Sequence, residues 1–157
     1  MIRSATTTDV PTIAQLIRAL AEYERLSDRV TLDENRLRDH LFGPRPFAEV
    51  LLAEAGIEVV GFALFFHNYS TFLGRPGIYL EDLFVKPEHR GKGHGKALLA
   101  ALARLAVQRD CGRMEWAVLD WNEPSINFYK ALGATPLDEW TGYRLTGAAL
   151  LKLAEPS

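Results

Sequence analysis

The fold is decided by the stretch RGKGHGK (residues 90–96), which joins a strand-like segment to a helix-like segment. Residues 78–85 before it are apolar at six of eight positions, and residues 93–109 after it carry leucine and alanine at helical spacing. Alternating glycines cost a helix up to about 1 kcal/mol each relative to alanine. They also remove Cβ atoms that would keep a ligand off the backbone. Together with the free N–H groups of a helix start and three basic side chains, the stretch predicts an anion site, above all for phosphate.

Two familiar phosphate-binding motifs do not fit this stretch. A P-loop needs Gly-x-x-x-x-Gly-Lys followed by Ser or Thr, whereas Lys96 is followed by Ala97. A dinucleotide fingerprint needs Gly-x-Gly-x-x-Gly after the first strand, whereas these glycines alternate in mid-chain. From the residues alone, a glycine-rich loop with solvated basic side chains stays open as the alternative.

The elements predicted on either side of this stretch give the order β-α-α-β-β-β-α-β-α-β-β. That order predicts a mixed α/β fold, with a central twisted mixed β-sheet, helices on both faces and a single domain over residues 1–157. The second helix is expected to open on a capping box, Thr31 to Glu34, and to end at Gly43-Pro44. The other predicted elements are strands at 2–5, 48–54, 57–68, 78–85, 114–121, 135–140 and 142–146, a loop at 69–77, and helices near 9–20, 93–109 and 123–132.

The composition excludes several classes of function. The chain has 157 residues, 48% hydrophobic and 24% charged, and a formal net charge of -2, so no basic field attracts nucleic acid. No apolar run approaches the roughly 20 residues that cross a bilayer, so we expect no membrane partner. The single cysteine, Cys111, fits a reducing compartment, and we expect a cytoplasmic protein.

Two carboxylates, Glu81 and Asp82, interrupt the apolar segment 78–85. Neighbouring strand residues point to opposite faces, so the two acids share one site only if a bulge intervenes. An alkyl amine has a pKa near 10.4 and must lose a proton before it attacks a carbonyl. A carboxylate can bind the ammonium and, through a water, help remove that proton. We take Glu81 as the first candidate base and Asp82 as the second; the alternative is a buried ion pair with a basic residue such as Arg3.

The pattern Arg90-x-x-Gly93-x-Gly95 resembles the Gln/Arg-x-x-Gly-x-Gly/Ala signature of the GNAT superfamily of acyl-CoA N-acyltransferases. Segments 121–130, 79–85 and 20–24 resemble its diamine acetyltransferase branch, the spermidine/spermine and thialysine acetyltransferases. The resemblance covers nearly the whole chain. It implies the GNAT fold, acetyl-CoA as cosubstrate, no metal, and a homodimer with active sites near the subunit interface.

The resemblance also implies roles for individual residues. It assigns the general acid to Tyr129. The implied cofactor contacts are Leu83, Phe84, Val85, Arg90, Gly91, Lys92, Gly93, His94, Gly95, Lys96, Asn122, Glu123, Pro124 and Ser125. The implied substrate contacts are Tyr23, Glu24, Glu81, Glu115, Trp116 and Ala117.

Helical spacing places Asn122, Ser125 and Tyr129 on one side of a helix, with Asn122 at or just before its start. A phenol near the sulfur of CoA can protonate the departing thiolate. The alternative is a core tyrosine beside Phe128. Cys111 could be a nucleophile, although a small, partly buried residue is the simpler interpretation. The four histidines show no metal-ligand spacing with each other or with this cysteine.

These observations predict an N-acetyltransferase that moves acetyl from acetyl-CoA to a primary amine of a small molecule by direct attack in a ternary complex. Polyamine, thialysine-like and lysine-like substrates all stay open. Two other functions stay open as well. One is a non-catalytic module that binds acyl-CoA, and the other is an acetyltransferase that acts on a protein amine.

Overall fold

A five-stranded sheet forms the centre of residues Met1–Leu119, the first of two units in a computed structural model that describes all 157 residues. The second unit is Asp120–Ser157, and each unit is described by itself. The strands lie in the order β1-β2-β3-β4-β5. All neighbours are antiparallel except β4 and β5, which are parallel, so the predicted mixed sheet is confirmed. Their bounds are β1 (Ile2–Ser4), β2 (Glu49–Ala55), β3 (Glu58–Ser70), β4 (Arg75–Val85) and β5 (Met114–Trp116).

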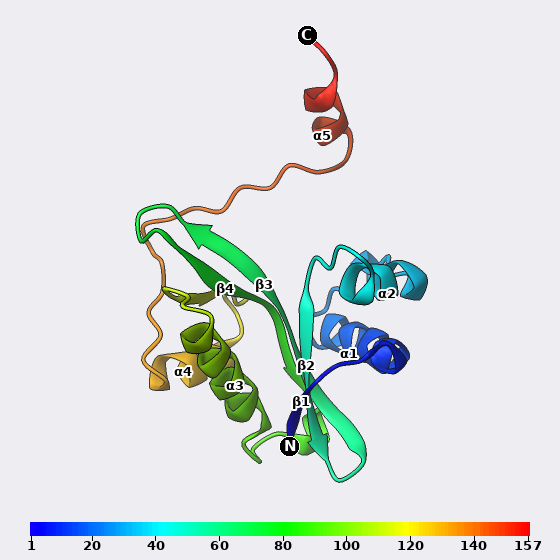
Figure 1. Cartoon of the computed structure of the whole chain (residues 1–157), viewed down its shortest axis with the longest axis vertical. Helices are drawn as coiled ribbons and strands as arrows, with labels where there is room; N and C mark the ends of the chain where they lie inside the picture. The colour runs from blue at the N-terminus through cyan, green and yellow to red at the C-terminus, as the bar shows by residue number, and fades with distance from the viewer. The chain divides into compact units, whose positions relative to one another are not determined.

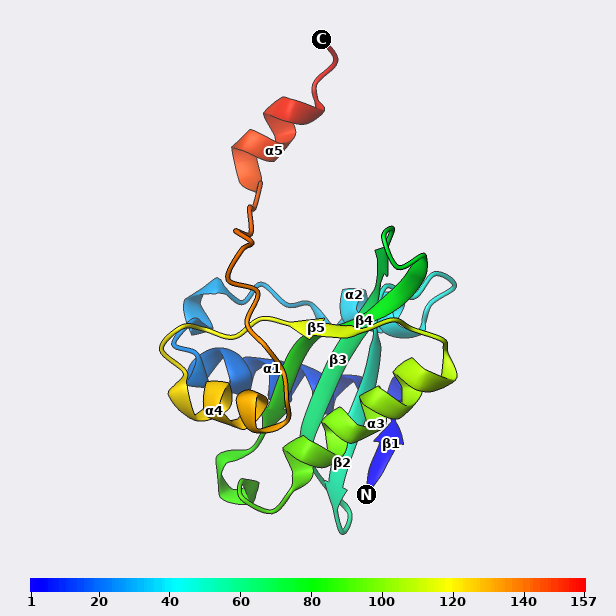
Figure 2. The same cartoon turned by 90° about the vertical axis from the view of Figure 1, so that its left-hand side faces the viewer.

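Helices cover both faces of this sheet. Helices α1 (Val10–Tyr23) and α2 (Glu34–Phe42) lie on one face, and α3 (His94–Gln108) lies on the other (Figure 1). Figure 2 shows α3 crossing in front of the sheet and α1 behind it. Three short 3-10 helices are η1 (Thr7–Asp9), η2 (Ser27–Arg29) and η3 (Pro87–His89). The core on the α1 side consists of Ile13, Leu16, Leu20, Leu41, Val50, Leu52, Phe62 and Phe84.

Local sequence explains where the first helices begin. Pro11 occupies the first turn of α1, where its missing N–H costs no hydrogen bond. Helix α2 is capped by Asp33, whose side chain accepts a hydrogen bond from the Arg36 amide at 3.0 Å. The expected capping box beginning at Thr31 is therefore wrong, because the carboxylate two residues later lies at the right distance from the free amide. Helix α2 ends at Gly43, as predicted.

The predicted strands are right in number up to β5 but differ in length. The expected loop 69–77 shrinks to residues 71–74, because β3 and β4 form one long hairpin whose pairing reaches Ser70 and Arg75. The expected strand 114–121 stops at Trp116, because its parallel ladder with β4 ends at the pair Leu80 and Trp116. Strand length is set by the ladder partner, which the pattern of one segment does not reveal.

The second unit contains α4 (Glu123–Ala131) and α5 (Gly147–Ala154). Gly133 takes the left-handed conformation, φ 91°, at the predicted end of the first of these helices. The strands expected at 135–140 and 142–146 are wrong, because neither segment pairs with another strand. Helix α5 was not expected, although its sequence GAALLKLA is rich in helix formers. None of the chain's helices has the length and apolar character that crossing a membrane requires.

Candidate functional site

A β-bulge in the middle of β4 changes the direction of its side chains. In the register with β3, Leu64 lies opposite Asp82 and the next residue, Phe65, lies opposite Leu80, so Glu81 is the extra residue. Leu80 therefore shares a face of the sheet with Phe65, whereas Asp82 shares the opposite face with Leu64. That second face is the one covered by α1, since Phe84 belongs to the core on the α1 side.

The bulge brings three carboxylates, those of Glu24, Glu81 and Asp82, within electrostatic reach of one another. Burial and the charges of Glu81 and Glu24 raise the pKa of Asp82 from 3.8 to about 7. Burial also raises the pKa of Glu24, which caps the C-terminal end of α1. Glu81 itself is exposed. A carboxyl group with a pKa near neutrality suits general-base chemistry at physiological pH.

The alternative of an ion pair between Arg3 and the acids of β4 does not hold. The guanidinium of Arg3 donates to both carboxylate oxygens of Asp9, at 2.8 and 2.9 Å, and lies 3.1 Å from Glu54. This network joins β1 to η1 and β2, and it holds the pKa of Asp9 down at about 2 through the hydrogen bonds from Arg3. Asp82 therefore keeps its raised pKa without that counterion.

A fourth carboxylate, that of Glu115, lies on β5 near Tyr79. It stands opposite Tyr79 in the parallel ladder, and burial together with the charges of Glu81 and Glu115 raises the pKa of the Tyr79 phenol. One carboxylate oxygen of Glu115 accepts hydrogen bonds from Asn68 and Arg113, each at 3.2 Å. The contact of Asn68 with Glu115 was not predicted from the sequence, because the two residues lie 47 positions apart and no local periodicity connects them.

The edge of β4 becomes free of its neighbour immediately after the bulge. The ladder with β5 stops at Leu80 and Trp116, while β4 continues to Val85. Ala117, the first residue beyond the ladder, is exposed. Within segment 83–85, the backbone groups that face the β5 side have no strand partner, although the Val85 carbonyl accepts a hydrogen bond from Arg90, and an extended chain with amide groups could bind there as an added strand.

The glycine-rich turn opens α3 with its amides accessible. Gly91 and Gly93 have left-handed backbones, with φ 76° and 86°, and Gly93 is the N-cap of α3. A Cβ added at either glycine would meet nothing within 4 Å, so the space above both residues is open. The N–H groups of the first helical turn, residues 94–96, have no partner within the helix. With Lys92 and Lys96 exposed alongside, the turn can bind an anionic group such as a phosphate, whereas the side chain of Arg90 is directed elsewhere.

The side chain of Arg90 reaches from this turn to the ends of α1 and β4. Its guanidinium carbon lies 4.5 Å from the ring centroid of Tyr23, the last residue of α1, and 5.5 Å from that of Phe84. Its Nε donates a hydrogen bond to the carbonyl of Val85 at 2.9 Å. The contact with Tyr23 could not be predicted from local sequence, since the two residues belong to elements far apart in the chain.

The second unit carries the remaining predicted residues on α4. Asn122 is the N-cap, and its side-chain oxygen accepts a hydrogen bond from the Ser125 amide at 3.4 Å. Glu123 begins the helix and Pro124 lies in its first turn. The ring of Tyr129 is half-buried, 5.6 Å from that of Phe128, and helical spacing places it on the side of Asn122 and Ser125.

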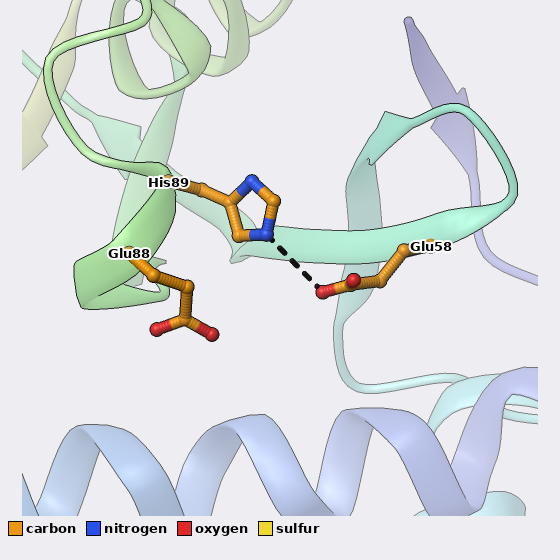
Figure 3. A group of neighbouring side chains, drawn as sticks. All are labelled: Glu58, Glu88 and His89. Carbon is orange, nitrogen blue, oxygen red and sulfur yellow. Dashed lines mark ion pairs between the residues drawn. The ribbon is translucent and has the colours of Figure 1, made fainter.

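Two further places in the first unit carry metal-ligand-type or nucleophilic side chains. Glu58, Glu88 and His89 place their ligand-type atoms within 4.8 Å of one another (Figure 3). The carboxylate of Glu58 is engaged there by Lys86 and by His89 Nε2, both at 3.3 Å, so these ion pairs join the start of β3 to η3. Cys111 is half-buried, and its amide donates to Ala106 at the end of α3, which agrees with a structural role.

Comparisons with known proteins agree with this geometry. Residues 12–134 match the acetyltransferase (GNAT) family. The chain is 45% identical to a thialysine N-epsilon-acetyltransferase of Bos taurus, covering 98% of this chain and 96% of the relative. It is 38% identical to the L-ornithine N5-acetyltransferase NATA1 of Arabidopsis thaliana, covering 95% of this chain and 85% of the relative.

A solved structure shares the fold. An integron cassette protein from the mobile metagenome of V. cholerae superposes with a TM-score of 0.82 at 28% identity, covering 99% of this chain and 98% of the other. The family match spans most of the chain, and the bovine relative is aligned over nearly its whole length. The chain therefore belongs to the GNAT acetyltransferase family, within the diamine and thialysine acetyltransferase branch.

Proposed function

We propose that this acetyltransferase moves an acetyl group from acetyl-CoA to the terminal primary amine of a small cationic molecule. The observation that carries the proposal is the acidic cluster of Glu24, Glu81 and Asp82, which lies at the bulge where the edge of β4 becomes free. A protonated amine is attracted to such a cluster, and its reacting nitrogen would then lie beside the strand that takes the cosubstrate.

Asp82 is the proposed proton acceptor, in place of Glu81, which the sequence favoured. With a pKa of about 7, Asp82 is ionised in a large fraction of molecules at neutral pH and accepts a proton more readily than an ordinary carboxylate. Glu81 is exposed on the bulge and is proposed to bind the incoming ammonium. A water between the amine and Asp82 would carry the proton.

The other proposed groups stabilise charge elsewhere in the reaction. When bound, acetyl-CoA supplies the thioester that the amine attacks in a ternary complex. The free backbone N–H groups of segment 83–85 would polarise its carbonyl. The Tyr129 hydroxyl on α4 is the proposed proton donor for the leaving thiolate, with Asn122 to Ser125 as further contacts to the cosubstrate. This assignment requires the two units to act as one catalytic domain over residues 1–157.

The names of the relatives suggest which amine to test first. The bovine relative is named for the epsilon nitrogen of thialysine and the Arabidopsis relative for N5 of ornithine, both side-chain amines of an amino acid. We therefore propose such an amino acid as the first substrate class, with lysine-like amines, diamines and polyamines after it.

We also propose that the protein is a homodimer and that it is cytoplasmic. The exposure of Leu151 at 70% and Leu153 at 74% on α5 supports a partner subunit at the C-terminal segment.

The direct test is the release of free CoA thiol with acetyl-CoA and a panel of amines. The panel holds thialysine, ornithine, lysine, a diamine and spermidine, together with a peptide that carries a free lysine. Turnover of at least one small amine above the peptide is expected. Tight CoA binding without turnover of any amine would instead indicate a non-catalytic module, and preference for the peptide would indicate a protein acetyltransferase.

A further inference from the structure

Tyr23 and Glu24 lie at the end of α1, where a tertiary contact would help to hold the last turn in place. The helix closes with a hydrogen bond from the Leu26 amide to the carbonyl of Ala21 at 2.8 Å, and Arg25 takes a left-handed backbone, φ 63°. Glycine normally fills that position, because a side chain there strains the backbone. A strained last turn opens more easily than the middle of a helix.

Arg90 supplies such a contact from the opposite side of the site. Its planar guanidinium packs on the ring of Tyr23, at 4.5 Å, and near the ring of Phe84, at 5.5 Å. The hydrogen bond from Nε to the Val85 carbonyl fixes the guanidinium on the end of β4. The positive charge is thus directed toward α1 and β4, although Arg90 directly precedes the glycine-rich turn.

We propose that Arg90 is a positioning residue that couples the cosubstrate site to the amine site. A ligand that orders the glycine-rich turn also fixes the backbone of Arg90, and the guanidinium then holds Tyr23 and the end of α1. Glu24 follows Tyr23 directly, so its carboxylate stays at the acidic cluster only while that end stays in place. Binding of a CoA-type ligand therefore tightens amine binding, and by linkage the amine tightens CoA binding by the same factor. The amine site in this inference rests on the proposed function, whereas the contact of Arg90 with Tyr23 does not depend on it.

The first test follows α1 directly by hydrogen exchange, with CoA itself as the probe. In the wild-type protein, saturating CoA is expected to slow amide exchange over residues 22–26. Arg90→Met should abolish that protection while changing the calorimetric Kd for CoA by less than about threefold. Tyr23→Leu should reproduce the loss, and Tyr23→Phe should keep the protection because the ring remains. Lys92→Met is the matched control: it removes a charge from the same turn, weakens CoA binding, and should leave the protection intact once CoA is saturating.

The second readout separates KM from kcat if an amine is turned over. Arg90→Met should raise the KM of the amine by about two- to fivefold, the range that a cation–π contact at an exposed site supports, with kcat little changed. Arg90→Lys should recover part of the loss, since it keeps the charge but not the planar contact.

The inference is overturned if Arg90→Met keeps full protection of residues 22–26. It is equally overturned if that variant weakens CoA binding tenfold or more at unchanged amine KM, because Arg90 would then be a phosphate ligand. If the wild-type protein acetylates no amine, the proposed function fails while the exchange measurement still decides on Arg90.

Discussion

Replacing Asp82 with asparagine should stabilise the protein at alkaline pH while removing its proposed base. The pKa of Asp82 is about 7 in the folded chain against 3.8 for an ordinary aspartate. Between these two pKa values Asp82 is protonated in the folded state and ionised in the unfolded state. The free energy of unfolding therefore falls as pH rises from about 4 to about 7, and the whole cost of ionising Asp82 in the folded state is present above pH 7. A pKa difference of about three corresponds to about 4 kcal/mol, at about 1.36 kcal/mol per pKa unit. Asparagine has nearly the same shape and no charge, so it escapes the penalty.

The assay is urea denaturation of both proteins at pH 4, 6 and 8. At pH 8 the variant should be more stable by about 3 to 4 kcal/mol, an increase in the midpoint of about 2 M urea for a typical small domain. At pH 4 the two midpoints should coincide. Asp28→Asn, at an exposed position in η2, is the matched control and should show no such dependence. The reasoning is refuted if Asp82→Asn gives the same difference at pH 4 and pH 8, or if it is the less stable protein at pH 8.

Three further predictions concern catalysis and the cosubstrate. The value of kcat/KM should rise with pH through about 7 as Asp82 ionises. Asp82→Asn should lower kcat/KM at least about 100-fold and abolish this rise with pH. A wild-type kcat/KM that is constant from pH 6 to 8 would argue against Asp82 as the base. Tyr129→Phe should lower kcat about 10- to 100-fold while calorimetry shows an unchanged Kd for CoA, and unchanged turnover would exclude the phenol as the acid. Gly93→Ala should cost about 1 kcal/mol in thermal unfolding, because φ is 86°, and should weaken CoA binding, whereas Gly142→Ala should do neither.

Helical periodicity and turn residues were enough to predict the order of the main helices and strands in the first unit, but not all of their bounds. Pro11, Gly43 and the glycines after residue 90 act on their own neighbours, so the positions of α1, α2 and α3 follow from local sequence. The length of β5 and the absence of strands at 135–146 depend on which ladder partner is present. That information is held by distant parts of the chain, and local patterning does not contain it.

The candidate site was predictable in its residue types but not in its assignments. Two adjacent acids in an apolar strand indicated a site, and the bulge needed to bring them together was recognised as a condition. The sequence does not reveal that Asp82 is half-buried and Glu81 exposed, because pairing with Leu64 and Phe65 of β3 determines which residue of β4 forms the bulge. The contact of Arg90 with Tyr23 likewise joins the end of a helix to a turn that follows it only much later in the chain.

The extra residue in β4, Glu81, adds a side chain that the ladder with β3 does not need. Before it, even-numbered side chains such as Leu80 point away from α1; after it, even-numbered side chains such as Asp82 and Phe84 point toward α1. Deleting Glu81 would make Leu80 and Asp82 neighbours on opposite faces, as simple alternation requires, so only the bulge would be lost. Asp82 and Phe84 would stay on the α1 side of the sheet. The residue at position 81 can therefore be exchanged or removed without turning any other side chain of β4 to the other face.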